Sequence, residues 1–251
     1  MKAMKKKHLL LLSVTVVLAT VINLFAGVLV VSAAEGDGLT GSGTESDPYL
    51  ISSKEDLLKL EGQTLTASYK LTTNINLANG DTKENWTPIT SFGGTFDGNG
   101  YTISGFTITS TNVANVAFIG KLTGTLKNLT VANATVNVAD NTTVYDVAVL
   151  VANSNGTIEN CKIENSVEMN VGVLTASSRT RLGGVCAYAG ARIAYCENNA
   201  SVTSAKNEKH KVFVGGIAGM SASTVEYCVN NGAIAMTNTS GWKGHLGGIL
   251  G

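Results

Sequence analysis

A short glycine-rich signature returns along the chain at a nearly constant interval, and this interval limits the possible folds more than any other feature. The signature is Gly-Gly-Ile-Ala-Gly at 215–219, and Gly-Gly-Ile-Leu-Gly follows at 247–251. A related version precedes it at 183–187, and looser versions lie at 116–120 and 148–152. Self-similarity with a period of roughly 20–50 residues is typical of stacked repeat architectures. We therefore expect a solenoid built from units of this length.

Other positions of the unit repeat with the same steps. The signatures end at Gly120, Ala152, Ala187, Gly219 and Gly251, so the second step is three positions longer than the others. We call a set of equivalent positions in successive units a column. A second column, Leu129, Cys161, Cys196 and Cys228, has the same longer step between its second and third members. Two further aliphatic columns are Leu126, Ile158, Ile193, Val225 and Val136, Val167, Val202, Ile234. Because separate columns share the same insertion, the repeat involves the whole unit and not only its glycines.

The apolar pattern within a unit is that of short strands. One unit predicts three of them, at residues 157–163, 167–173 and 182–188, and the middle one alternates strictly between apolar and polar residues. Ile158 and Cys161 are three positions apart, which predicts a bend that turns both side chains inward. No unit has a helical stripe. The predicted fold is therefore all-β, with about five coils of a parallel β-helix (a β-solenoid) whose strands stack about 4.8 Å apart.

The chain begins like an exported protein. Four lysines (Lys2, Lys5, Lys6 and Lys7) precede an apolar run at residues 9–31, and small residues follow at 31–33. This order predicts a signal peptide at residues 1–33, and an uncleaved membrane anchor is the alternative. Its removal leaves 14 basic against 18 acidic residues, a net charge of −4, which argues against nucleic acid as a partner. We expect a secreted or bacterial cell-surface protein that meets the membrane only through this segment.

The remaining chain divides into a cap and the repeats. Residues 34–91 form an expected N-terminal cap with one helix at 52–60, for which Ser53 is the predicted N-cap and Gly62 the stop. Residues 92–251 form the expected β-helix, with a tight turn at residues 97–100. A solenoid end normally differs from its middle, yet Gly251 is the last residue of a signature and no polar cap follows it, for which an end that docks on a partner is the alternative explanation. We therefore expect further C-terminal repeats or domains.

The four cysteines are interpreted mainly as packing residues. Cys161, Cys196 and Cys228 share one column, so we expect small buried thiols stacked in the core, with one strained disulfide as the alternative. A zinc site is not expected, because the sequence has no C-x-x-C and no histidine in that column. Since common catalytic motifs are also absent, we predict no catalytic residue, no metal and no cofactor.

A variable loop precedes each signature, and these loops carry the predicted binding site. The four loops, at 139–146, 174–181, 204–211 and 237–245, should project from one edge of the solenoid. The last three are basic, and their candidate residues are Arg179, Arg181, Lys206, Lys209, His210, Lys211, Trp242, Lys243 and His245. On an acidic chain, such a basic ridge with an aromatic side chain favours an anionic glycan or a host or cell-surface ligand. The alternative is that exposed loops simply carry charge.

Several stretches resemble bacterial Glug-motif proteins. The resemblance lies in Gly-Thr-Glu-Ser-Asp-Pro-Tyr-Leu-Ile at 43–51, Thr-Phe-Asp-Gly-Asn-Gly-Tyr-Thr-Ile at 95–103, and the Gly-Gly-Ile-x-Gly units. It covers nearly all of residues 41–251. The resemblance implies a right-handed parallel β-helix on exported surface proteins, some of which are adhesin-like and some of which accompany immunoglobulin A-cleaving zinc peptidases. The zinc motif of those peptidases is absent, so their activity does not carry over.

These observations predict a non-enzymatic, exported surface scaffold or adhesin-like binding module. The alternative is a carbohydrate-active enzyme domain of the polysaccharide lyase or glycosidase type, for which only analogy with other β-helices argues. A cluster of carboxylates or lysines in a groove would favour the enzyme. A smooth wall of Thr, Asn and Gly would favour the scaffold.

Overall fold

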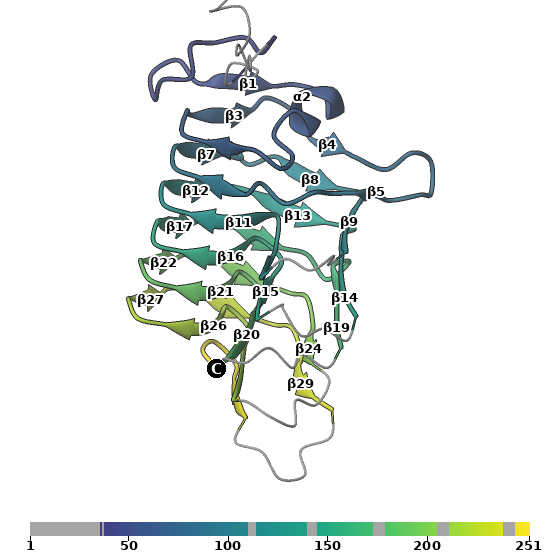
Figure 1. The fold of residues 1–251 in the computed structure, drawn as a ribbon, viewed down its shortest axis with the longest axis vertical. Helices are drawn as coiled ribbons and strands as arrows, with labels where there is room; N and C mark the ends of the chain where they lie inside the picture. Colours follow the sequence, from purple (N-terminus) through teal and green to yellow (C-terminus); the bar gives the residue numbers. More distant parts are fainter. Residues whose placement is uncertain are drawn as a thin grey trace, which may run out of the picture. The chain divides into compact units, whose positions relative to one another are not determined.

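The chain forms a parallel β-solenoid, as predicted. The computed structural model describes residues 36, 38–109, 114–139, 145–172, 179–204, 211–237 and 244–251. The chain divides into two compact units, Met1–Asp37 and Gly38–Gly251, and the solenoid is the second of them. The predicted signal peptide lies outside the described residues. In the solenoid, equivalent strands of successive coils lie side by side from the N-terminal to the C-terminal end (Figure 1).

The strands form five parallel sheets, which we number I to V in the order in which a coil passes through them. Sheet I contains β10 (Asn115–Val116), β15 (Asp146–Ala148), β20 (Thr180–Gly183), β25 (Val212–Gly215) and β30 (His245–Gly247). Sheet II contains β2 (Thr64–Leu65), β6 (Ser91–Phe92), β11 (Ile119–Leu122), β16 (Val151–Ser154), β21 (Cys186–Ala189) and β26 (Ala218–Ser221). Sheet III contains β1 (Tyr49–Ile51), β3 (Tyr69–Leu71), β7 (Thr95–Asp97), β12 (Thr125–Lys127), β17 (Thr157–Glu159), β22 (Ile193–Ala194) and β27 (Val225–Glu226).

The remaining two sheets complete each coil. Sheet IV contains β4 (Ile75–Asn76), β8 (Thr102–Ser104), β13 (Thr130–Ala132), β18 (Lys162–Ile163), β23 (Glu197–Asn198) and β28 (Val229–Asn230). Sheet V contains β5 (Glu84–Asn85), β9 (Phe106–Thr109), β14 (Thr135–Val138), β19 (Glu168–Val171), β24 (Val202–Ser204) and β29 (Ile234–Met236). Strands β1 to β5 belong to these sheets, so the solenoid already begins within residues 34–91.

A coil has five strands rather than the three predicted. The predicted strand at 157–163 is divided into β17 and β18 by a corner at Asn160, whose φ of 52° lies in the left-handed region. The predicted strand at 182–188 is divided into β20 and β21 by a bend after Gly183. The predicted number of strands was wrong because a short corner does not interrupt the apolar pattern, but the corner at Asn160 confirms the bend predicted between Ile158 and Cys161. The inward turn of Ile158 and Cys161 is confirmed, since both are fully buried.

Strand pairing confirms one aliphatic column and corrects the other. Leu126, Ile158, Ile193 and Val225 are direct partners on successive coils, as predicted. In the column that begins at Val136, the residue before Val202 is Met169, not Val167. Val167 and Met169 lie two positions apart and both are buried. A slip by two positions keeps the same face of a strand inward, so the apolar pattern alone could not distinguish them.

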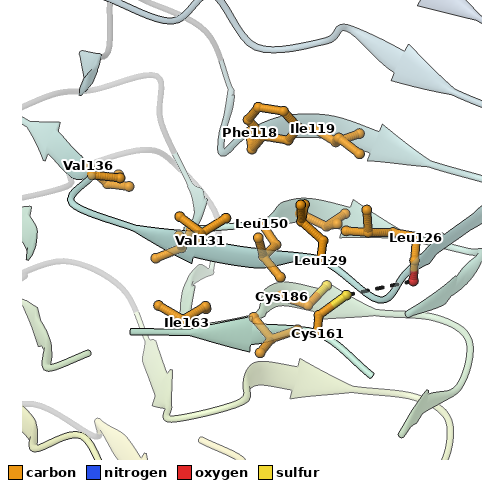
Figure 2. Packing of buried hydrophobic residues seen from close by; sticks show 14 of the residues in the cluster. Phe118, Ile119, Leu126, Leu129, Val131, Val136, Leu150, Cys161, Ile163 and Cys186 are labelled. Carbon is orange, nitrogen blue, oxygen red and sulfur yellow. Dashed lines mark hydrogen bonds between the residues drawn. The ribbon is translucent and has the colours of Figure 1, made fainter. Parts of the chain in front are cut away.

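The interior is a continuous ladder of aliphatic side chains with thiols among them. Leu126, Leu129 and Cys161 lie close together inside the solenoid, and the Cys161 thiol points to the carbonyl oxygen of Leu126 (Figure 2). All four cysteines are free, and three of them are buried. The Sγ of Cys228 accepts a hydrogen bond from the backbone N–H of Cys196 at 3.5 Å, which places these residues on adjacent coils. The interpretation as stacked packing thiols is therefore confirmed.

The two glycines of the signature have different roles. A Cβ on Gly183 would collide with the carbonyl oxygen of Cys186, so this glycine lets sheets I and II approach each other closely. A Cβ on Gly184 would collide with the side chain of Asn198 and with the next coil. Asn198 is fully buried and donates hydrogen bonds to Ala200 O and to Asn230 Oδ1. The second glycine thus makes room for a hydrogen-bonded amide inside the solenoid.

The N-terminal part closes one end of the core. Helix α2 (Lys54–Leu58) is capped by Ser53, whose side chain accepts a hydrogen bond from the N–H of Asp56, as predicted. Leu57 and Leu60 are buried against the core, and Trp86 stacks on Phe118 at 4.5 Å. The predicted turn at 97–100 is also present, with its third and fourth residues at positive φ. Among the described residues, no helix has the length and apolar character needed to cross a membrane.

The role of the second glycine predicts a clear difference between two alanine substitutions. We expect Gly184→Ala to lower the free energy of unfolding by about 2 kcal/mol, because the added methyl group displaces Asn198 or the backbone of the next coil. Gly248→Ala occupies the same place in its signature, but nothing lies within 4 Å of its new Cβ. Thermal unfolding followed by circular dichroism should therefore separate the two variants. Equal melting temperatures would contradict this account.

Candidate functional site

The structure describes four of the nine predicted binding residues. Arg179 and Lys211 are exposed and directly precede Thr180 and Val212, which are paired partners in sheet I. Arg181 and His245 lie within sheet I itself. The other five predicted residues lie outside the described residues: Lys206, Lys209, His210, Trp242 and Lys243. The loops that carry them join sheet V to sheet I in successive coils, as the repeat predicts.

The described members do not form a uniformly basic row. Strand pairing places five residues in one column of sheet I, which are Asn115, Asp146, Arg181, Phe213 and His245. His245 is exposed and stacks on Phe213, with ring centroids 4.8 Å apart and planes 7° from parallel. Arg181 instead points to the acidic member of the column. Polar, charged and aromatic groups therefore follow one another from coil to coil.

Sheets I and II meet at a tight corner of each coil. The close approach at Gly183 brings the two strands together, and four alanines form a small buried cluster separate from the main core. They are Ala117, Ala148, Ala152 and Ala187. Side chains from sheet I converge here with Asn153 and Tyr188 from sheet II. We call this place the I/II corner and define it by Asn115, Asp146, Asn153, Arg181 and Tyr188.

An ion pair occupies the middle of the I/II corner. Nε and Nη2 of Arg181 donate hydrogen bonds to Oδ1 and Oδ2 of Asp146, at 2.5 and 2.7 Å. The Asp146 side chain is fully buried, and that of Arg181 is 17% exposed. The guanidinium carbon of Arg181 lies 4.5 Å from the ring centroid of Tyr188 and 6.0 Å from that of Tyr145. Such bidentate, stacked geometry is specific to arginine.

The environment of Asp146 determines what it can do chemically. Burial raises the pKa of its carboxyl above the usual value, and the hydrogen bonds and charge of Arg181, with a hydrogen bond from Asn153, oppose the rise. Both carboxylate oxygens accept hydrogen bonds from Arg181, and the buried side chain is shielded from solvent. The pair therefore acts as a clamp between two coils, β15 and β20, rather than as an acid–base group.

A cavity adjoins the I/II corner at its N-terminal end. It has a volume of about 230 Å³ and is lined by Thr87, Pro88, Thr90, Ala114, Asn115 and Gly120. The side-chain Oδ1 of Asn115 is buried and has no hydrogen-bond partner among the described residues. The repeat pattern does not reveal this place, because Asn115 belongs to the first coil that contributes to sheet I and has no equivalent in an earlier coil.

Sequence reasoning also missed an aromatic pair at the corner between sheets III and IV. Tyr195 and Tyr227 have φ values of 55° and 53° and occupy the corner position at which the earlier coils have Asn128 and Asn160. Their rings stack at 5.0 Å, and the residues are 55% and 70% exposed. Arg192 lies beside Tyr195, 5.8 Å from its ring. The signal was visible, because each tyrosine directly precedes a cysteine of the predicted column.

The fold and the I/II corner define the chain as a parallel β-solenoid repeat protein. Among known proteins, it is 35% identical over 167 residues to halomucin from Haloquadratum walsbyi, a match that covers 58% of this chain but only 2% of halomucin. A crystal structure of a protein described as a candidate immunoglobulin A1 protease from Bacteroides ovatus matches with a TM-score of 0.50 and 17% identity. That match covers 86% of this chain and 88% of the other, and it shows the fold alone. No family model matches this sequence, so the resemblance to Glug-motif proteins stays a prediction.

The ion pair predicts a large and specific loss of stability. Arg181→Met should lower the free energy of unfolding by about 3 kcal/mol at neutral pH, because it leaves the Asp146 carboxylate buried without its partner. Arg179→Met changes an exposed residue two positions away and should alter stability by less than about 0.5 kcal/mol. Urea unfolding of both variants measures the difference.

The same substitution should have a defined pH dependence. Without Arg181, the folded state favours protonated Asp146, so the deficit should shrink in acid solution, where the buried charge is removed, and grow as the pH rises. Adding Asp146→Asn to Arg181→Met should restore part of the loss at neutral pH. A deficit that is independent of pH would mean that Arg181 acts only through packing.

Proposed function

We propose that this chain is a non-enzymatic, exported surface scaffold that acts as an adhesin-like binding module. Its ligand is an anionic glycan or another acidic group on a host or cell surface, held by the basic loops before sheet I. The N-terminal pattern of lysines and apolar residues supports export. The name of the relative halomucin, which describes a mucin, supports a location outside the cell.

The register of sheet I is the observation that carries the proposal. Thr180 pairs with Val212, so the exposed Arg179 and Lys211 stand at equivalent positions on adjacent coils. Adjacent parallel strands lie about 4.8 Å apart, so positive charges repeated at this step form a line along the solenoid. A linear polyanion carries its charges in a row as well. Such a line attracts it from solution, with a strength that falls as salt rises.

The alternative, a carbohydrate-active enzyme, has less support. The I/II corner does contain a carboxylate, which is the feature that would favour an enzyme. However, Asp146 accepts two hydrogen bonds from Arg181 and is fully buried, so it cannot serve as the general acid or base of a glycosidase. Among the described residues, no group of three His, Cys, Asp or Glu side chains is arranged to hold a metal ion.

Charge removal tests the proposed ligand class. Binding of the full chain to immobilised heparin at low ionic strength should weaken at least about tenfold when Lys206, Lys209, Lys211 and Lys243 are replaced by serine. The control replaces four other lysines with serine, namely Lys59, Lys70, Lys121 and Lys127, which have the same total charge. Binding to the control should stay close to that of the unchanged chain. Equal weakening of both variants, or no weakening of either, would contradict the proposal.

A further inference from the structure

We propose that the outer face of sheet III carries a binding site for a small zwitterion of the α-amino acid class. The site is a cavity of about 290 Å³ at the N-terminal end of the sheet, which we call the sheet III pocket. Its charged lining residues are Glu45, Lys70, Asp97 and Lys127. They lie outside the basic loops, so the inference does not depend on the proposed anionic ligand.

A short loop before β1 forms one wall of the sheet III pocket. Glu45 and Pro48 line the cavity from this loop. The backbone N–H of Ser68 donates to the carbonyl oxygen of Gly43 at 2.8 Å, which attaches the loop to the solenoid. Gly43 has a φ of 73°, and a Cβ at this position would collide with the ring of Tyr49, so the loop lies close against the sheet. The chain's own contacts therefore hold the wall in place.

The floor of the pocket is a column of sheet III in which the sign of the charge alternates. Strand pairing aligns Lys70, Asp97 and Lys127 on three successive coils. Adjacent coils are about 4.8 Å apart, so a positive charge follows the carboxylate on either side. All three residues are partly exposed and Glu45 is fully exposed, so solvent and ligands reach them. The pocket thus presents two charges of each sign.

These four charges are not neutralised by ion pairs within the chain. In the part of the chain that the structure describes, none of the four charged pocket residues forms an ion pair. The carboxylate of Asp97 is held from the corner between sheets III and IV, where Oδ1 accepts from Asn99 N–H at 2.8 Å and from Asn128 Nδ2 at 2.9 Å. Both bonds go to Oδ1, so Oδ2 can accept from a ligand. The carboxylate is therefore fixed in direction before a ligand binds.

Farther along the same face, charges are paired. Arg192 lies 3.6 Å from Glu159 and 2.7 Å from Glu226, which follow Lys127 in the same column. Unpaired charges on this face are thus found at the pocket, where a ligand can compensate them. A ligand of one sign would remove water from the opposite group without replacing it, which is unfavourable. A zwitterion compensates both signs.

The size of the pocket and the step of the column favour an α-amino acid. The cavity lies just below the roughly 300–1,000 Å³ of sites that take drug-sized ligands. An α-amino acid carries its ammonium and carboxylate on one carbon, so its charges fit adjacent members of the column. The ammonium donates to Oδ2 of Asp97, and the carboxylate accepts from a neighbouring lysine. Pro48 and Leu50 also line the cavity and offer apolar surface to the side chain.

Saturation-transfer NMR with the full chain tests the class of ligand. The probes are alanine, leucine and glutamine, each with its N-acetyl derivative, which keeps only the negative charge, and its amide, which keeps only the positive charge. At least one amino acid should show transfer. Its two derivatives should bind at least about tenfold more weakly, because each loses hydrogen bonds between charged groups. Transfer from no amino acid, or equal binding of either derivative, would overturn the inference.

Removing one sign of charge from the pocket should change which derivative binds. Glu45→Gln with Asp97→Asn leaves the two lysines, so this variant should prefer the N-acetyl derivative to the amino acid. Lys70→Met with Lys127→Met leaves the two carboxylates and should prefer the amide. All four side chains are at least partly exposed, and Asn at position 97 keeps an acceptor oxygen for its corner, so both variants should fold. An unchanged preference in both variants would contradict the proposed site.

A matched control and a second class of zwitterion complete the experiment. Asp81→Asn with Lys121→Met changes one exposed residue of each sign outside the pocket and should bind the amino acid like the unchanged chain. Binding of glycerophosphoethanolamine in place of every amino acid would assign the pocket to a lipid headgroup and overturn the inference. The variant with lysine-to-serine changes in the basic loops should bind the amino acid normally, so the two proposals can fail separately.

Discussion

Every feature of this structure depends on backbone hydrogen bonds between equivalent strands of successive coils. The strands are two to four residues long, which is too short to be stable alone, and each is fixed by its partners above and below. Pairing in five sheets at once leaves one register for the whole coil. That register aligns Leu126 with its aliphatic equivalents inside, and it places Asp146 beside Arg181 at the I/II corner. Core and surface are therefore specified together.

Although the register is constant, the type of side chain at an interior position changes from aliphatic to polar along the chain. At one position of sheet IV, the coil that contains β18 has Ile163, whereas the next two coils have Asn198 and Asn230. The side chains of these two asparagines are hydrogen-bonded to each other. These two coils also have glycine at the facing position, so that the amides fit. The corner between sheets III and IV changes in the same way, from asparagines to the stacked Tyr195 and Tyr227. A common backbone thus presents a different surface on each coil, which suits a scaffold that displays binding groups.

Periodicity predicted the fold because a repeat records coil-to-coil contacts directly. It predicted the parallel solenoid, the stacked cysteines and the inward bend at Cys161 correctly. It could not divide each apolar stretch at its corner, and it could not distinguish Val167 from Met169, since both face inward. Periodicity also could not predict the I/II corner. Asp146 and Arg181 belong to predicted loops of different units, and only the strand register in three dimensions makes them partners. The cavity beside Asn115 arises where sheet I begins, which is a break in the repeat rather than part of it.

The most direct test of this account is the removal of one whole coil. Deleting 188–219 joins Ala187 to Met220, the partner position of Tyr188, and keeps every later residue in its column. Deleting 188–218 instead retains Gly219, which shifts all later residues by one position and turns their inward side chains outward. Thermal unfolding followed by circular dichroism should show a cooperative transition and β-structure for the first variant, with a marked loss of stability for the second. Equal stability of the two variants would contradict a fold that is set by coil register.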